Sequence, residues 1–124
     1  MRSYKVQGII VKQRELGEKD YLLTIVTPTL GKIEIHAKGA RRIESKFTGH
    51  LDLLNVCNFQ LYKSPKNYII TECLLIQNYE HFRQDLDKFY ISNEVAKMAW
   101  KFTTEDEENL EIYKLIIDTF IALE

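Results

Sequence analysis

The sequence KIEIHAK, residues 32–38, alternates polar and apolar side chains along its whole length. Strict alternation is typical of a β-strand with one face in a protein core and the other in solvent. Ile33, Ile35 and Ala37 would face the core. The outer face would then carry Lys32, Glu34, His36 and Lys38.

Four other segments are rich in the apolar and β-branched residues that strands favour. Two precede the alternating strand and two follow it, at residues 4–14, 21–27, 53–63 and 68–77. Gly8 is expected to bend or bulge the first of them, and Ser64-Pro65-Lys66-Asn67 has the composition of a tight turn. The sequence therefore predicts five strands, with one long polar connection over residues 39–49.

After residue 79 the apolar period changes from two residues to 3.6. Residues 82–102 are expected to form a helix with apolar side chains on two nearly opposite sides, a pattern typical of a helix packed between two neighbours. Thr104-Glu105-Asp106-Glu107 fits a capping box, which predicts that a second helix begins there and runs to Leu123. The apolar arc of that helix spans about half its circumference, so we expect more chain or a second copy to cover it.

These patterns predict an α+β fold. A five-stranded antiparallel barrel would cover residues 1–79, and residues 80–124 would form the first two helices of a truncated helical domain. The order of elements favours an OB-fold, whose barrel binds oligonucleotides across its second and third strands and the nearby loops. Another small barrel, such as an SH3-like one, remains the alternative, because periodicity does not fix topology.

The near-neutral net charge of −1 hides an uneven distribution. Residues 1–50 carry ten Lys/Arg against five Asp/Glu, and residues 80–124 carry five against eleven. Five cations fall within fifteen residues of the basic part, where phosphates could be neutralised: Lys32, Lys38, Arg41, Arg42 and Lys46. Aromatic residues that could stack on bases are Tyr4, Phe47, Tyr62 and Tyr68. The alternative is an ordinary solvated loop with no ligand.

Composition and motifs exclude several classes of protein. No run of about 18 apolar residues could span a membrane, and no secretory signal begins the chain, so a cytoplasmic protein is expected. Gly31-Lys32 lacks the glycines of a phosphate-binding loop, and no Gly-x-Ser-x-Gly or His-Glu-x-x-His motif occurs. His36, His50 and Asp52 do not have the pattern of a metal site. We therefore expect no enzymatic activity, no metal and no cofactor.

The stretch TPTLGKIEIHAKGARRIESKFTGHLDLL, residues 27–54, resembles the bacterial recombination and repair mediator RecO. The residues that carry this resemblance are Gly31-Lys32, Ala37-Lys38-Gly39-Ala40-Arg41-Arg42, Ser45, Gly49 and Leu51. Residues 15–23 are similar to the first hairpin of the family, and residues 92–94 and 113–123 are similar to its first helices. The resemblance spans essentially this whole chain but only the N-terminal half of a typical member.

The resemblance implies an N-terminal OB-fold followed by a helical domain. It also implies binding of single- and double-stranded DNA, annealing of complementary strands, and binding to the tail of single-strand-binding protein. With RecR, such proteins help to load RecA onto coated DNA. The zinc-binding cysteines of some members follow position 124, so no zinc is expected here.

Carried over by position, the expected DNA-binding residues are Lys32, Lys38, Arg41 and Arg42, with Arg14, Lys19 and Lys46 added as neighbours. The main rival hypothesis is a protein-interaction adaptor, whose barrel docks RecR or single-strand-binding protein with little DNA contact of its own.

Overall fold

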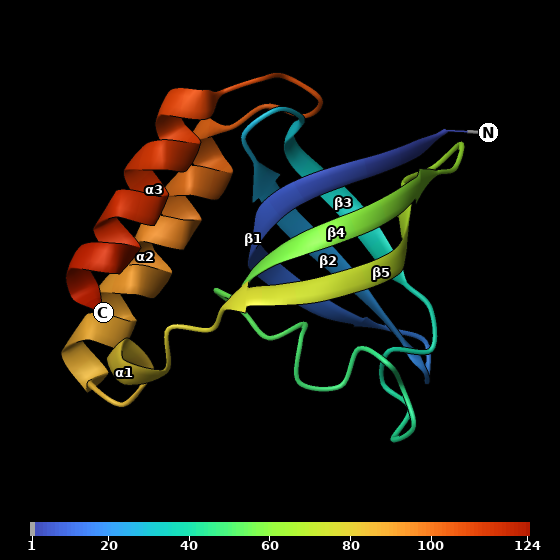
Figure 1. Cartoon of the computed structure of the whole chain (residues 1–124), viewed down its shortest axis with the longest axis horizontal. Coiled ribbons are helices and arrows are strands. Elements are labelled where there is room, and N and C mark those ends of the chain that lie inside the picture. Colours follow the sequence, from blue (N-terminus) through green and yellow to red (C-terminus); the bar gives the residue numbers. More distant parts are fainter. Residues whose placement is uncertain (1) are drawn as a thin grey trace.

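The computed structural model describes residues 2–124. Within that range the chain forms five strands and then three helices. They are β1 (Ser3–Leu16), β2 (Asp20–Thr27), β3 (Gly31–Ala37), β4 (Val56–Lys63), β5 (Tyr68–Gln77), α1 (Glu80–Arg83), α2 (Leu86–Phe102) and α3 (Leu110–Leu123). Figure 1 shows the strands wrapped into a barrel, with α2 and α3 lying side by side along one flank of it.

The barrel is closed in the order β1-β2-β3-β5-β4, which is the arrangement of an OB-fold, and this part of the sequence prediction is confirmed. The predicted antiparallel pairing holds for four of the neighbouring pairs but is wrong for β3 and β5, which run parallel through Ile35↔Tyr68 and His36↔Ile69. The reason is geometrical. An odd number of strands cannot alternate in direction around a closed ring, so one seam must be parallel.

Two apolar cores hold the structure together. The barrel interior is filled by side chains such as Ile10, Ile35 and Phe59, and the predicted alternation of β3 is confirmed by the burial of Ile33, Ile35 and Ala37. A second core joins the barrel to the helices: Ile9 and Val26 pack there with the helical residues Phe82, Ala96, Ala99, Tyr113, Ile116 and Phe120. The helices are therefore fixed to the outside of the barrel by burial of apolar surface.

Gly8 serves close packing rather than a bend. A Cβ atom at Gly8 would lie 3.0 Å from Ile25 Cδ1 and 3.2 Å from the Val26 carbonyl oxygen. The bulge of β1 lies further along, between Ile10 and Lys12. The predicted turn at residues 64–67 is confirmed, since the Ser64 amide donates to the Asn67 carbonyl at 2.8 Å.

The predicted helix over residues 82–102 is interrupted. Helix α1 ends at Arg83, and Asp85 caps α2, because its Oδ1 accepts hydrogen bonds from the amides of Asp87 and Lys88 at 3.1 and 3.2 Å. The prediction that α2 is buried on two sides is also wrong. Its small residues Ser92, Ala96 and Ala99 are buried, whereas Leu86 and Tyr90 are exposed by 83% and 65%.

The predicted capping box at Thr104 is wrong as well. Asn109 caps α3, with its Oδ1 accepting from the Ile112 amide at 3.1 Å. Residues 103–109 lie against the β2–β3 turn instead, where the Thr104 carbonyl accepts from the Lys32 amide and the Pro28 carbonyl accepts from the Asn109 amide, both at 3.2 Å. These contacts keep the segment extended, so the helix begins only after it.

Gly31 makes this contact possible. Its φ of +63° lies in the left-handed region, and an added Cβ would collide with the carbonyl oxygens of Thr104 and Glu107. In Figure 1 the segment between α2 and α3 meets the β2–β3 turn at one end of the barrel, while the long β3–β4 connection extends from the other end. The two ends of the barrel are thus built by different parts of the chain.

Candidate nucleic-acid interface

A groove crosses the outer face of β1, β2 and β3 where these strands pass beneath α2. Its volume is about 600 Å³. Side chains from three adjacent strands, from α2 and from the segment after α2 line it: Lys12, Gln13, Arg14, Leu22, Thr24, Lys32, Glu34, Trp100 and Glu105. We call this the β1–β3 groove. It lies on the strands that OB-folds use to bind oligonucleotides.

Trp100 stands at the rim of this groove with two ammonium groups against its indole ring. Lys12 Nζ lies 3.8 Å and Lys32 Nζ 4.5 Å from the ring centroid. Lys32 Nζ also donates to the Trp100 carbonyl oxygen at 3.0 Å. Each exposed cation–π contact stabilises by about 0.5–1 kcal/mol, so the lysines help to hold α2 over the strands.

Both signs of charge line the β1–β3 groove. Lys12, Arg14 and Lys32 are the cations, and Glu34 and Glu105 are the anions, so the groove carries a net charge of +1. Within residues 2–124 none of these five side chains forms an ion pair. The three ammonium and guanidinium charges are therefore available to an anionic ligand, at an affinity reduced by the two carboxylates.

The residues of the β3–β4 connection, which we call the basic loop (residues 38–50), are arranged differently. Arg41 Nη1 donates to the Gly17 carbonyl at 2.7 Å, and its Nη2 pairs with Glu15 Oε1 at 3.2 Å. The Arg41 amide donates to the Lys19 carbonyl at 2.9 Å. Arg41 thus ties the basic loop to the β1–β2 turn.

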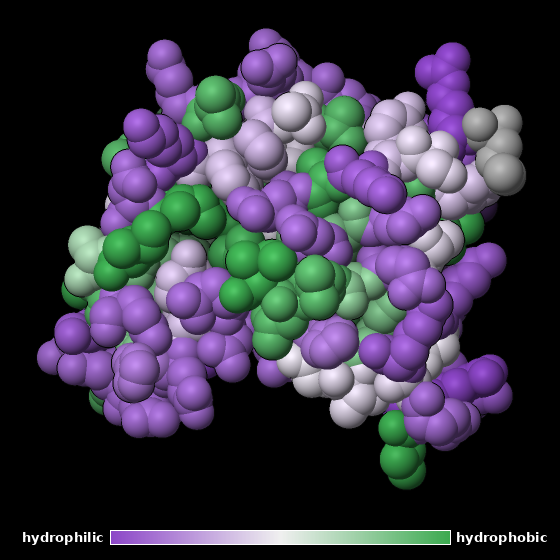
Figure 2. Space-filling view, in the orientation of Figure 1, coloured by the Kyte–Doolittle hydropathy of each residue, from purple (hydrophilic) through white to green (hydrophobic). Residues whose placement is uncertain are grey.

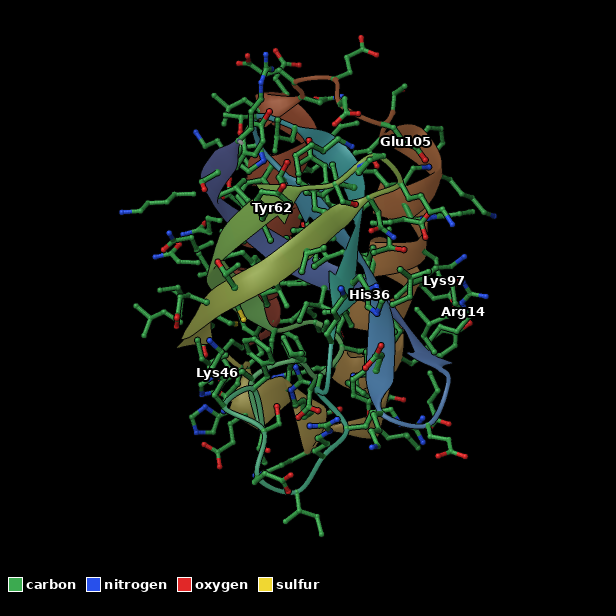
Figure 3. The ribbon with its side chains drawn as sticks, turned by 90° about the vertical axis from the view of Figure 1, so that its right-hand side faces the viewer. Arg14, His36, Lys46, Tyr62, Lys97 and Glu105 are labelled. Atoms are coloured by element: carbon green, nitrogen blue, oxygen red, sulfur yellow. The ribbon has the colours of Figure 1, made fainter. Side chains whose placement is uncertain are left out.

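Lys46 reaches in another direction, to β5. Its Nζ donates to the Thr71 carbonyl at 2.7 Å and pairs with Glu72 Oε1 at 3.3 Å. Figure 3 shows Lys46 and Arg14 at opposite edges of the barrel, with His36 between them. The cations predicted to form one cluster are therefore spread around the molecule.

The remaining predicted cations lie at the surface. Lys19, Lys38 and Arg42 are exposed, and none of them forms an ion pair within the described range, 2–124. Arg41 and Arg42 line a second hollow of about 370 Å³, together with Gln13 and Tyr21 from the neighbouring strands. Of the seven residues expected from the sequence, only Arg14 and Lys32 line the β1–β3 groove.

The start of the basic loop is fixed by Asp20. Its two carboxylate oxygens accept hydrogen bonds from the Gly39 amide at 2.7 Å and from His36 Nε2 at 2.8 Å. These bonds hold the pKa of Asp20 below its usual value, and the bond from the Gly39 amide has the larger effect. His36 is thus engaged in a structural contact with Asp20.

Most of the aromatic residues expected to stack on bases belong to the core. Phe47 and Tyr68 are 6% and 5% exposed, and Tyr4 packs edge-on against Tyr68 with ring centroids 5.5 Å apart. Tyr68 donates its hydroxyl to Asp106 at 3.1 Å, and burial together with that carboxylate raises the pKa of Tyr68 to about 12. Tyr62 is more open, with 36% of its surface exposed.

Among the groove residues with a positive charge or an aromatic ring, sequence reasoning missed Lys12 and Trp100. Lys12 belongs to a predicted strand but lies twenty residues before the dense basic stretch. Trp100 was expected among the apolar residues of a helix. No local pattern could join them, because their contact depends on how α2 crosses the barrel.

No helix among the described residues has the length and apolar character needed to cross a membrane.

Comparison with known sequences agrees with this architecture. The family model "Recombination protein O N terminal" matches residues 1–79. A DNA repair protein RecO from Caldanaerobacter subterraneus is 30% identical over 113 residues, covering 91% of this chain and 46% of the relative. The RecO of a Roseiflexus species is 30% identical over 98% of this chain and 43% of its own length. A Dehalococcoides mccartyi RecO is 31% identical over 98% of this chain and 48% of its own length.

The chain spans about half the length of the curated relatives it matches. The family model alone covers 79 of the 124 residues, including every strand of the barrel. The resemblance found in the sequence is confirmed, and the chain belongs to the RecO family.

Proposed function

We propose that this chain binds DNA in recombinational repair and that the β1–β3 groove is where a strand lies. The observation that carries the proposal is the convergence of Lys12, Arg14 and Lys32 on one groove without a paired carboxylate among the described residues. Phosphates bind to cations that are displayed together, because each neutralised phosphate releases condensed counterions. The name of the relatives, DNA repair protein RecO, supports the same assignment.

The other predicted cations extend the proposed contact surface. Lys19, Lys38 and Arg42 are exposed and unpaired within residues 2–124, so they would meet phosphates that leave the groove. Arg41 and Lys46 also belong to the proposed site. They would contribute less to phosphate binding, since carboxylates already neutralise part of their charge. Residues 1–79 would thus form the DNA-binding unit, and residues 80–124 would begin a helical domain.

The proposed mechanism needs no bond to be made or broken. Cations of the barrel would screen the phosphates of single- or double-stranded DNA without reading the bases. Two strands held on one surface repel each other less, which would favour annealing. In the full-length protein this activity would act with RecR and the single-strand-binding protein to load RecA. We propose a non-enzymatic, cytoplasmic protein without metal or cofactor.

The test is a titration of a fluorescently labelled oligonucleotide at two salt concentrations. Three groove contacts predict a slope of log affinity against log salt near about −2 for a single strand, hence a loss of about 15- to 20-fold between about 50 and 200 mM salt. Binding should be insensitive to base sequence. Absence of binding at the lower salt concentration would contradict the proposal.

A second candidate function is that of a protein-interaction adaptor. Exposed apolar side chains on the outer surface of β4 and β5 favour it. Tyr62, Leu74 and Ile76 are exposed there by 36%, 62% and 47%. Figure 2 shows apolar side chains gathered over the end of β5. In this reading the barrel docks RecR or single-strand-binding protein. Failure of the oligonucleotide titration together with capture of either partner would favour it.

A further inference from the structure

We propose that the indole of Trp100 is a stacking platform for an unpaired nucleobase, and that it makes the β1–β3 groove prefer single-stranded to duplex DNA. This inference rests on the proposed DNA-binding function and assigns a ligand to one residue of that site. The residue comes from α2, outside the barrel.

The position of Trp100 is firmly held. Ala99 of α2 and Thr103, which caps its C-terminal end, are 4% and 5% exposed. Thr103 donates its hydroxyl to the Ala99 carbonyl at 2.7 Å, and Lys32 Nζ binds the Trp100 carbonyl at 3.0 Å. The indole itself is only partly buried and lines the groove. The main chain that carries the ring is therefore already ordered, which lowers the entropy cost of presenting the indole to a base in the groove.

The cations that contact the ring are close enough to reach the phosphate of a stacked nucleotide once the base has taken the place of one of them. Lys12 Nζ and Lys32 Nζ lie within 4.5 Å of the ring centroid, and Arg14 follows Lys12 on the same strand, two positions along. In β1 the residues at positions 12 and 14 share a face because the side-chain period of a strand is two. A base on the indole would therefore have its own phosphate and the next one near a positive charge.

Displacement of a lysine from the ring by a base is energetically reasonable. An exposed cation–π contact contributes about 0.5–1 kcal/mol, whereas stacking of a base on an aromatic side chain contributes about 1–3 kcal/mol. Lys12 is exposed and has no hydrogen-bond or ion-pair partner among residues 2–124, so its ammonium can move from the ring to a phosphate. Lys32 Nζ is further from the ring centroid, at 4.5 Å, and can keep its hydrogen bond to the Trp100 carbonyl while a base takes the place of Lys12.

A base of duplex DNA could stack on Trp100 only after it had left its place in the double helix. Its bases are already stacked on one another, and unstacking costs a few kcal/mol for each step. A duplex would therefore meet only the cations of the groove, through its phosphates. The ring would contribute to single-strand affinity alone, which is the source of the proposed preference.

The experiment uses the only tryptophan of the chain, Trp100, as its own reporter. A thymidine oligonucleotide of about 12 nucleotides, a length within the range covered by one OB-fold, is titrated into the protein at low salt. Tryptophan emission and the anisotropy of a labelled copy are followed in parallel. A duplex of the same length and a strand of abasic sites are the comparison ligands.

We expect the oligonucleotide to quench Trp100 along the same isotherm as the anisotropy change, and the abasic strand to bind without that quenching. Trp100→Leu should lower single-strand affinity by about 10-fold, the equivalent of one lost stacking contact. Trp100→Phe should retain most of the affinity. Duplex affinity should stay within about twofold in both variants, and the salt slope should not change, because no phosphate contact is removed.

The possible failures are distinguishable. Single-strand binding without quenching, or with equal affinity in Trp100→Leu, overturns the stacking role and leaves the proposed function standing. Equal losses of single-strand and duplex affinity in a folded Trp100→Leu also overturn it, since they show a structural role for the ring. No binding of either ligand by the unmodified protein overturns the DNA-binding function and this inference with it.

Discussion

The β1–β3 groove and the basic loop carry similar numbers of cations but hold them in different ways. Of the four cations in the basic loop, Lys38 and Arg42 have no ion pair within residues 2–124, whereas Arg41 and Lys46 are bonded to Glu15 and Glu72 and to main-chain carbonyls. In the groove, Lys12 and Lys32 contact an aromatic ring, which leaves their charge unneutralised. A cation already paired with a carboxylate adds little to phosphate binding. The density of basic residues along the chain therefore overestimates the charge that the basic loop offers to a phosphate, since two of its four cations are paired, and it misses Lys12 in the groove.

The largest expected difference between the two regions is in the stability lost when a glycine of each is replaced by alanine. Gly31 lies beside the groove residue Lys32 and Gly39 begins the turn of the basic loop, and both have φ in the left-handed region, at +63° and +69°. Gly31→Ala should lower the free energy of unfolding by about 3 kcal/mol, because backbone strain is combined with a clash against Thr104 and Glu107. Gly39→Ala should cost about 1 kcal/mol, from strain alone.

Urea unfolding followed by circular dichroism measures both variants. The nearest atoms to a Cβ at Gly39 are in the flexible side chain of Arg42, at 3.7 and 3.8 Å, which is ordinary contact. Equal destabilisation by the two substitutions would show that the segment after α2 does not pack closely against Gly31.

Removal of charge should separate the two regions next. The double variant Lys12→Ala with Arg14→Ala should weaken single-strand binding by about 10-fold at about 50 mM salt and flatten the salt slope by about 1.4, since two phosphate contacts are lost. The matched loop variant, Arg41→Ala with Arg42→Ala, should flatten the slope by about 0.7, because Glu15 already neutralises Arg41.

Anisotropy titrations over a range of salt concentrations give both slopes. A larger effect from the loop variant than from the groove variant would reverse the assignment and place the DNA path along the basic loop. Unfolding free energies serve as the control, since loss of Arg41 also removes its contact with Gly17.

A smaller effect, confined to the basic loop, should appear on acidification. The ionised form of Asp20 accepts bonds from the Gly39 amide and His36, and its pKa is lower in the folded protein than in the unfolded chain. This contribution to stability is present above the unfolded pKa of about 3.9 and is lost as pH falls through the lower folded pKa.

Asp20→Asn should therefore cost about 1 kcal/mol near neutral pH and progressively less below about pH 4. Unfolding free energies measured from about pH 6 to pH 2.5 test this expectation. A difference between the two proteins that stays constant over that range would show that the charge of Asp20 is not what stabilises the loop. Single-strand binding by Asp20→Asn should be nearly unchanged at neutral pH, because Asp20 lies outside the groove lining.

The smallest expected effect comes from the carboxylates. Glu34→Gln removes one of the two anions of the groove and should raise single-strand affinity by about twofold to threefold at low salt, with the gain shrinking as salt is added. Glu44→Gln in the basic loop is the matched control and should change affinity by less. A greater gain from Glu44→Gln would indicate that phosphates approach the loop rather than the groove.

Much of the barrel could be predicted from local pattern. The alternation of residues 32–38 gives β3 and its buried face, and the turn at residues 64–67 follows from Ser, Pro and Asn chemistry. Boundaries set by distant contacts could not be predicted. Thr104 has the residues of a helix cap, but the Lys32 amide binds its carbonyl, and that bond comes from a strand 72 positions earlier.

The candidate site also contains residues that the sequence predicted and residues that only distant contacts bring together. Arg14 and Lys32 were expected near DNA, and the structure places both in the groove. Arg41 and Lys46 were expected there too, but Glu15 and Glu72 bind them from other strands. Lys12 and Trp100 were not expected, because neither stands out from its own segment.

Side-chain periodicity, turn chemistry and the family motif around Gly31-Lys32 were enough to specify a RecO-type barrel followed by helices. These signals are local, since each depends on residues within a few positions of one another. Which cations are neutralised, and which aromatic ring meets them, followed from the closure of the barrel and from the path of α2 across it. Such contacts join residues far apart in the chain, and their energies depend on distances that exist only once the apolar cores have formed.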